Sequence, residues 1–334
     1  MRVAVTGGAG YLGALVVKEL LARGQDVTVL DSLIHGQVEV ADRLALEGAR
    51  IVEGDVRDPG ARAEALTGAT SVVHLGAIVG DPACARDPEL AESVNIEGTR
   101  ALVTDARARG TERFLFASTC SNYGRMSDPT VPVDETGDLA PVSLYAEQKV
   151  GIERWLLGGD HGTLAPTCLR FATLYGAAPR MRFDLTVNEF TRDLWAGRQL
   201  EVFGERFWRP YVHVADAARV VCSVLEADRE SVRGQVFNVG RSDENYRKLD
   251  LVEMITTRLG RGEVSYVHRA EDPRDYKVGF EKLVDRLGLR PRSRVPEGVD
   301  EIITRLEQGR FGDPFHPRHS NLTSGRVAEA TPVS

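Results

Sequence analysis

Short apolar runs, each bounded by polar turn residues, recur through the first half of the chain. They are rich in β-branched residues and too short for helices, which favours buried strands. The runs lie at residues 3–6, 27–30, 50–53, 71–75 and 113–118. Between the first two runs, apolar residues recur every three or four positions up to Gly24, which predicts a helix with one apolar face. This alternation predicts βαβ units and a parallel sheet.

The second half of the chain is more mixed. Two further apolar runs, residues 167–171 and 235–239, are expected to join the same sheet. We therefore predict an α/β fold with a doubly wound parallel sheet and a smaller mixed C-terminal lobe. The predicted units are a discontinuous sheet domain of residues 1–174 and 211–241, and a lobe of residues 175–210 and 242–309, with helical stretches at residues 249–259 and 297–306. Residues 310–334, rich in Pro, His and Ser, are expected to form a loosely ordered tail.

Composition narrows the class of protein. The chain has 334 residues, of which 42% are hydrophobic and 27% charged, as in ordinary globular proteins. A net charge of −7 without any Lys and Arg cluster argues against a nucleic-acid surface. No apolar run approaches the roughly 18 residues that a membrane helix needs. The cysteines are too widely spaced for a zinc site or a disulfide framework, so we expect no bound metal and a cytoplasmic, reduced location. They are Cys84, Cys120, Cys168 and Cys222.

A glycine-rich turn follows the first predicted strand and opens the first predicted helix. Residues 5–13 read VTGGAGYLG. Glycines in this position allow a tight turn and let backbone amides approach a pyrophosphate at the positive helix end, which indicates a Rossmann dinucleotide site rather than a purely structural turn. Asp31 ends the second predicted strand and is placed to accept hydrogen bonds from the adenosine ribose. Its carboxylate would repel a 2′-phosphate, so NAD(H) is favoured over NADP(H).

Tyr145 and Lys149 stand one helical turn apart in residues 143–149, SLYAEQK. Residues at this spacing share a helix face, so the ammonium is expected to lower the pKa of the phenol and make it usable as a base. The alternative is an ordinary solvated helical pair. Together with the glycine turn, the pair favours an enzyme that transfers hydride.

With these motifs in this order, the sequence resembles the extended short-chain dehydrogenase/reductases over about residues 1–290. Within them it is most similar to the NAD-dependent nucleotide-sugar epimerase/dehydratase family, of the UDP-galactose 4-epimerase type. Residues 6–13 look like the family's phosphate turn, and Asn95 stands where the family has a structural asparagine. The resemblance implies contacts to NAD from Gly7, Gly10, Tyr11, Leu12, Asp31, Asp55, Val56, Leu75, Gly76, Ala77, Tyr145 and Lys149.

The same resemblance implies the catalytic and substrate residues. Residues 116–124, FASTCSNYG, are similar to the fifth-strand signature and place Thr119 at the catalytic Ser/Thr position, beside Tyr145 and Lys149. Arg209 resembles the arginine that grips the sugar-nucleotide diphosphate, although Pro210 replaces the Asp that commonly follows it. The further nucleotide contacts implied are Asn188 and Arg274, and residues 179–184 are expected to select the sugar nucleotide.

The family's reactions all begin by oxidising C4 of a hexose and differ in the next step. The 4,6-dehydratases carry an Asp-Glu pair directly after the catalytic Thr, where this chain has Cys120 and Ser121. The 3,5-epimerases carry a Cys at the position of Ser121, so Cys120 stands one place early and should point to the other side of the strand. Both routes are therefore disfavoured.

The reaction that needs no extra acid or base is 4-epimerisation of a nucleotide sugar, and we take it as the expected function. The alternative is a C4 ketoreductase or oxidase of a modified sugar nucleotide. A non-catalytic NAD sensor is disfavoured because it has no use for Tyr145 as a base. Relatives commonly pair through the Tyr-Lys helix and the preceding helix, here residues 89–109, so a homodimer is expected, with Leu156 and Leu157 beside Trp155 as apolar support.

Overall fold

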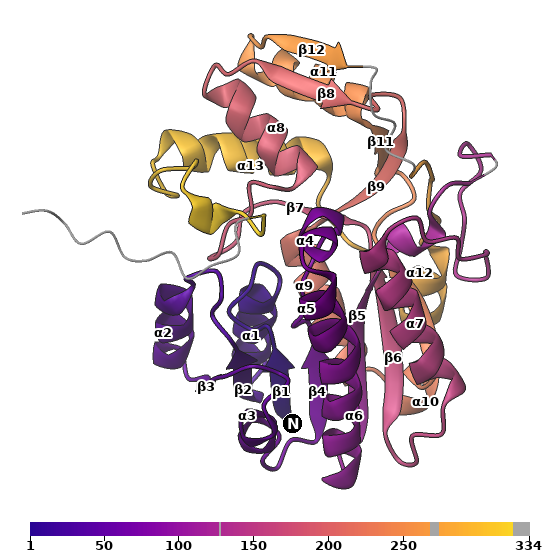
Figure 1. Cartoon of the computed structure of the whole chain (residues 1–334). Coiled ribbons are helices and arrows are strands. Elements are labelled where there is room, and N and C mark those ends of the chain that lie inside the picture. The colour runs from indigo at the N-terminus through magenta and orange to yellow at the C-terminus, as the bar shows by residue number, and fades with distance from the viewer. Residues whose placement is uncertain (127, 268–273, 323–334) are drawn as a thin grey trace, which may run out of the picture.

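The computed structural model describes residues 1–126, 128–267 and 274–322 (Figure 1). Its centre is a parallel sheet whose strands run in the order β3-β2-β1-β4-β5-β6-β10. The strands are β1 (Arg2–Thr6), β2 (Asp26–Asp31), β3 (Arg50–Glu53), β4 (Ser71–His74), β5 (Arg113–Thr119), β6 (Ala165–Phe171) and β10 (Gln235–Val239). The sequence prediction of a doubly wound parallel sheet is confirmed, with strand ends displaced by no more than two residues.

Helices cover both faces of this sheet because alternate strand residues point to opposite sides. Val3 and Val5 of β1 belong to one apolar cluster, together with residues of α1 and α9. Ala4 between them belongs to a second cluster, with residues of α6 and α7. The helices around the sheet are α1 (Gly13–Ala22), α2 (Val38–Leu46), α3 (Pro59–Ala65), α4 (Asp81–Arg86), α5 (Pro88–Glu92), α6 (Thr99–Ala108), α7 (Leu144–Gly158), α9 (Val214–Glu226), α10 (Arg229–Val232) and α12 (Glu281–Leu287). A π-helix, Ser93–Gly98, joins α5 to α6.

A smaller lobe lies beyond the carboxyl ends of the strands (Figure 1). It contains a three-stranded sheet in the order β11-β9-β7 and the parallel pair β12-β8. Its elements are β7 (Thr173–Tyr175), α8 (Thr186–Trp195), β8 (Leu200–Phe203), β9 (Trp208–His213), β11 (Asn245–Arg247), α11 (Lys248–Leu259), β12 (Val264–Val267) and α13 (Val295–Glu307). The helices α11 and α13 cover the two helical stretches predicted there. None of the helices in the described ranges combines the length and apolar character that crossing a bilayer requires.

Two segments differ from the predicted domain plan. Within residues 242–309, assigned to the lobe, α12 packs against β10 of the main sheet, and Lys282 donates to the Val236 carbonyl at 2.8 Å. The expected loose tail is also ordered over residues 310–322, because Phe311 packs edge-on against Phe183 with ring centres 5.2 Å apart. The backbone N–H of Phe183 donates to the His319 carbonyl at 2.7 Å. The rest of that expected tail, residues 323–334, lies outside the described residues.

Candidate active site

A cavity of about 390 Å³ opens where the carboxyl ends of the strands meet the lobe. Every residue of the expected cofactor set lines it, and so do Thr119, Tyr145, Lys149 and Arg274. Asn188 and Arg209 do not line it. The topology therefore brings the three expected catalytic residues and the glycine turn together at one site, although they are spread over 143 positions of the sequence between Gly7 and Lys149.

The glycine turn is shaped by two close approaches. Gly7 has φ +68°, and a Cβ atom added there would lie 2.8 Å from the backbone nitrogen of Gly76. A Cβ atom on Gly13 would lie 2.0 Å from the Gly7 carbonyl oxygen. The turn thus leaves room that side chains would fill, directly before the N-terminus of α1, the positive end of the helix. This cradle fits a dinucleotide pyrophosphate.

Asp31 is held rigidly at the end of β2. Its carboxylate accepts hydrogen bonds from the N–H groups of Ala9 at 2.9 Å and Leu33 at 3.0 Å, and from the Gln37 amide at 3.1 Å. Burial raises the pKa of this carboxyl, while the same hydrogen bonds oppose the rise. A carboxylate has about four lone-pair sites, so Asp31 retains one with which it could accept a further ribose hydroxyl.

Lys149 projects from α7 toward the end of β5. Its ammonium donates to the Ala117 carbonyl at 2.7 Å and lies 4.6 Å from the Phe116 ring centre. The same nitrogen lies 5.8 Å from the ring centre of Tyr145. Burial lowers the pKa of Lys149 to about 8. Ser143 caps the start of α7, and its hydroxyl accepts from the Ala146 N–H at 3.3 Å, so the first turn, which carries Tyr145, is held by the cap.

The electrostatics of Tyr145 differ from the sequence expectation. Burial raises the pKa of the phenol, and Cys84 adds to the rise. The positive charge that opposes it most comes from Arg182 rather than from Lys149. The expectation that Lys149 lowers this pKa was based on helical spacing alone, which does not register how far burial penalises a phenolate.

Thr119 is the last residue of β5, and its hydroxyl oxygen accepts from the Ser121 N–H at 3.1 Å. This bond leaves the hydroxyl hydrogen available for another acceptor in the cavity. Behind it, the buried hydroxyl of Ser118 donates to Glu153 at 2.8 Å, and Glu153 forms a buried ion pair with Arg170. The pair ties β5 to α7 and β6, so Thr119 and Lys149 are held in a fixed relation.

The three expected substrate contacts have different surroundings. Arg274 lines the cavity and forms an ion pair with Asp81 at 2.8 Å, and Asp81 also accepts from the Ser143 hydroxyl at 2.6 Å. Arg209 is buried behind Tyr276, with its guanidinium carbon 5.2 Å from that ring centre, and it donates to the Trp208 carbonyl at 2.6 Å.

Asn188 is fully buried and supports the cavity wall rather than forming part of it. Its oxygen accepts from the Gly176 N–H at 3.0 Å, and its amide donates to the Tyr11 hydroxyl at 3.0 Å and the Arg182 carbonyl at 2.8 Å. The side chain therefore orients Tyr11 and the segment that follows Gly176.

Sequence reasoning did not single out several residues that line the cavity. They are Asp81, Arg180, Arg182, Tyr276 and Asn321. Arg180 and Arg182 lie in the segment expected to select the substrate, so the sequence had already pointed to this stretch of the chain. Asn321 gave no such signal, because the segment around it lacks apolar periodicity.

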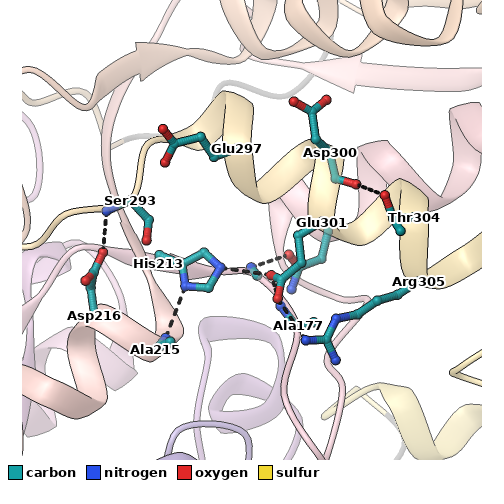
Figure 2. Close-up of polar contacts among 12 residues, drawn as sticks. Ala177, His213, Ala215, Asp216, Ser293, Glu297, Asp300, Glu301, Thr304 and Arg305 are labelled. Carbon is teal, nitrogen blue, oxygen red and sulfur yellow. Dashed lines mark hydrogen bonds and ion pairs between the residues drawn. The ribbon is translucent and has the colours of Figure 1, made fainter.

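A polar network holds Ala177, two residues before the segment expected to select the substrate (Figure 2). The Nδ1 atom of His213 accepts from the Ala215 N–H at 3.2 Å, so its Nε2 atom carries the hydrogen and donates to Glu301 at 3.0 Å. The Ala177 N–H donates to the same carboxylate oxygen at 3.0 Å, and Arg305 pairs with the other oxygen at 3.0 Å. Ala177 is thus anchored to α13 of the lobe.

Comparison with known proteins gives consistent matches. The model of the NAD dependent epimerase/dehydratase family matches residues 3–240. A UDP-glucose 4-epimerase of Lacticaseibacillus casei is 29% identical over 328 residues, which cover 91% of this chain and 95% of the relative. A dTDP-glucose 4,6-dehydratase of Streptomyces niveus is 30% identical over 317 residues, which cover 91% of this chain and 92% of the relative.

Solved structures of the same two kinds superpose closely. The UDP-glucose 4-epimerase of Thermus thermophilus in complex with NAD has a TM-score of 0.80 at 28% identity, covering 92% of this chain and 99% of that one. The dTDP-glucose 4,6-dehydratase from Streptomyces venezuelae, with NAD bound, has a TM-score of 0.84 at 27% identity, covering 94% and 99%. The similarity extends over both the sheet and the lobe and does not separate the two reactions.

Proposed function

The chain belongs to the NAD dependent epimerase/dehydratase family, and from this premise we propose that it is a nucleotide-sugar 4-epimerase acting by transient oxidation at C4 of the hexose. It is an NAD-dependent enzyme of this family. The observation that carries the proposal is the set Thr119, Tyr145 and Lys149 in one cavity, with neither an acid nor a base on the two residues after Thr119.

The chain's own residues fit NAD. The glycine turn would hold the pyrophosphate, Asp31 the adenosine ribose, and Lys149 the nicotinamide ribose. Asp55 and Val56 would contact the adenine. Residues 75–77 would line the cavity between the adenosine and nicotinamide ends of NAD. When bound, NAD accepts a hydride from the sugar and returns it.

Three side chains would manage the proton and the oxygen at C4. Tyr145 takes the proton of the C4 hydroxyl and later returns it, acting as base and then as acid. Thr119 has a hydroxyl hydrogen to donate to the same oxygen. Because burial raises the pKa of Tyr145, its phenolate needs positive charge nearby. Arg182 opposes the rise, and Lys149, which has a pKa of about 8 and is charged below that pH, lies 5.8 Å from the Tyr145 ring centre.

The structure around Cys120 supports epimerisation over dehydration. Its buried thiol donates to the Arg170 carbonyl at 3.3 Å, and burial raises the pKa of the thiol, so it is not a proton carrier in the cavity. Within the described ranges, the carboxylates that line the cavity are Asp31, Asp55 and Asp81. Asp31 and Asp55 are bonded at the expected adenosine end, and Asp81 is bonded to Ser143 and Arg274.

The fate of a C4 deuterium label tests the reaction. UDP-hexoses and dTDP-hexoses labelled at C4 would be incubated with the enzyme and followed by NMR. The proposal predicts a C4 epimer that keeps the label at C4. A 4-keto-6-deoxy product with the label at C6 would instead assign a dehydratase. Label accumulating in NADH in amounts equal to a 4-keto product would assign a C4 oxidoreductase.

A homodimer in the cytoplasm completes the proposal. Leu156 is buried in the protomer's own core, so Trp155 and Leu157, which are partly exposed, would have to make the apolar contact on α7. The four cysteines, Cys84, Cys120, Cys168 and Cys222, are free thiols, which agrees with a reducing compartment. A sedimentation experiment that detects only monomer at micromolar concentration would contradict the proposed homodimer.

A further inference from the structure

A second cavity, of about 520 Å³, adjoins the cofactor cavity. It lies between α1 and α2 on one side and residues 177–181 and the C-terminal segment on the other, where Figure 1 shows that yellow segment above the two helices. His35, Gln37 and Arg180 line both cavities. Gln37 donates to Asp31, so the second cavity begins at the end of the first where the adenosine ribose is expected.

The walls of the second cavity carry a large excess of positive charge. Glu39 is the acidic residue among its lining residues. The cations are Lys18, Arg43, Arg180, Arg305, Arg310 and Arg318. Lys18 pairs with Glu47, and Arg305 with Glu301. In the part of the chain that the structure describes, the other four form no ion pair with a carboxylate.

Arg180 is the strongest sign that an anion belongs there. Its side chain lies in the wall with the residue only 6% exposed, and its Nε atom has no hydrogen-bond partner. A terminal nitrogen donates weakly to the Ser320 carbonyl at 3.4 Å. Burial and the nearby charge of Arg182 lower the pKa of Arg180 to about 10. The nearby carboxylates of Asp184 and Asp31 oppose this lowering, but neither forms an ion pair or hydrogen bond with Arg180. A buried guanidinium that no carboxylate contacts favours a partner that brings negative charge.

His35 adds a polar group to the same wall. Its Nδ1 atom is buried and without a hydrogen-bond partner. Burial and the charge of Arg180 lower the pKa of this imidazole to about 4. A neutral imidazole can donate one hydrogen bond to an anion, while Arg180, Arg310 and Arg318 offer planar guanidinium groups that match phosphate oxygens.

We propose that this second cavity is a binding site for a phosphate-bearing anion, separate from the substrate site. Two sources supply this chemistry: a free phosphorylated small molecule, or the 2′-phosphate of a dinucleotide reaching through from the cofactor cavity. The site goes beyond the proposed reaction and does not depend on which reaction the enzyme performs. Its wall is shared with the cofactor cavity through Arg180, so an occupant would bear on cofactor affinity.

The test is calorimetric titration of inorganic pyrophosphate into the full-length, NAD-loaded protein. Two variants, Arg43→Gln and Arg310→Gln, each remove one charge that forms no ion pair and leave the buried Arg180 in place. Loss of one charge-assisted contact should weaken binding by about tenfold in each. Arg206→Gln is the control, because the Arg206 side chain is 83% exposed between β8 and β9 and lines neither cavity. Arg274→Gln reports on pyrophosphate in the proposed substrate site.

The site is supported if pyrophosphate binds saturably and loses affinity in Arg43→Gln and Arg310→Gln but not in Arg206→Gln or Arg274→Gln. A parallel titration with NADP separates the sources. The 2′-phosphate is the occupant if NADP excludes pyrophosphate and Arg310→Gln weakens NADP but not NAD; a free anion is the occupant if pyrophosphate binds equally with either dinucleotide. No saturable binding at millimolar pyrophosphate, or loss of binding in Arg274→Gln alone, would overturn the proposal.

Discussion

Lys149 donates to the main-chain carbonyl of Ala117 at 2.7 Å, and this bond joins α7 to the end of β5. The two elements carry the expected catalytic groups, Tyr145 on the helix and Thr119 on the strand. This side chain therefore helps to hold the two elements together and places a positive charge within the cavity.

Replacing Lys149 by Met should lower turnover by about 10²-fold, because both the charge and the link to β5 are lost. NAD affinity should fall as well. Lys282→Met is a matched control, since Lys282 also donates to a strand carbonyl, that of Val236, at 2.8 Å, but lies outside the cavity. Steady-state rates and NAD titrations of both variants check the prediction. Equal losses of turnover and NAD affinity in the two variants would show that Lys149 has only a structural role.

Gly7→Ala should weaken NAD binding by tenfold or more, on the order of 1.4 kcal/mol. The added methyl group would press on the Gly76 nitrogen, 2.8 Å away, in a backbone with φ +68°. Gly24→Ala separates the two effects, because Gly24 has φ +75° with nothing within 4 Å. That control should cost about 1 kcal/mol of unfolding free energy for the left-handed backbone and leave NAD affinity unchanged. If both variants bind NAD alike, the turn is not the pyrophosphate cradle.

Asp31→Asn should lower NADH affinity by about tenfold, because a charge-assisted hydrogen bond to the ribose is lost. The preference for NADH over NADPH should narrow, since the neutral amide no longer repels a 2′-phosphate. Asp31 also accepts two backbone N–H groups, so some loss of thermal stability will accompany the change. Fluorescence titration of both reduced dinucleotides measures the ratio. A wild-type protein that prefers NADPH would contradict the assignment.

His74 should make the protein sensitive to acid. The Thr99 hydroxyl donates its one hydrogen to the Asn95 carbonyl, so it accepts from His74 Nε2 at 2.8 Å. The Nδ1 atom of the neutral ring then accepts from the Thr6 hydroxyl at 2.6 Å, while the Thr6 oxygen accepts from the Gly76 N–H. These bonds leave no place for a second proton.

Burial correspondingly lowers the pKa of His74 from 6.5 to about 3. As pH falls between these values the unfolded chain takes up a proton that the folded protein refuses, so the free energy of unfolding should fall by up to about 1.4 kcal/mol per pH unit. Urea unfolding of the wild type and of His74→Gln from pH 7 to pH 4 isolates this contribution. An identical pH slope in both proteins would show that His74 does not contribute.

The sequence predicted those features of the fold and site that depend on residues close together along the chain. Strand runs such as residues 235–239 were recognisable from composition, and the glycine turn from its position after β1. The parallel sheet was predictable because strands that alternate with helices pair in few ways. Thr119, Tyr145 and Lys149 lie in one cavity because they occupy the carboxyl end of β5 and the first turns of α7.

Contacts between distant segments were not readable in the same way. Asn188 and Arg209 match the residue types of the family's substrate contacts, but neither lines the cavity. Asn188 bonds to Gly176 and Tyr11, and Arg209 bonds to the Trp208 carbonyl. Residues 310–322 are ordered by scattered contacts, among them those of Phe311 and His319 with Phe183 and the hydrogen bond from the Asn321 N–H to Asp184, which leave no periodic pattern in the sequence. The raised pKa of Tyr145 arises from burial, a property of the whole fold.

The most direct test of the proposed chemistry is Tyr145→Phe, which removes one hydroxyl and keeps the ring that packs beside Lys149. The account predicts unchanged folding and unchanged affinity for NAD and the nucleotide sugar, with turnover reduced by about 10²-fold or more. Thr119→Val should cost less, because it removes one hydrogen bond to the C4 oxygen and leaves the proton carrier in place. Interconversion of nucleotide sugars by Tyr145→Phe at close to the wild-type rate would contradict the account, because the Tyr145 and Lys149 pair would then have no part in the reaction.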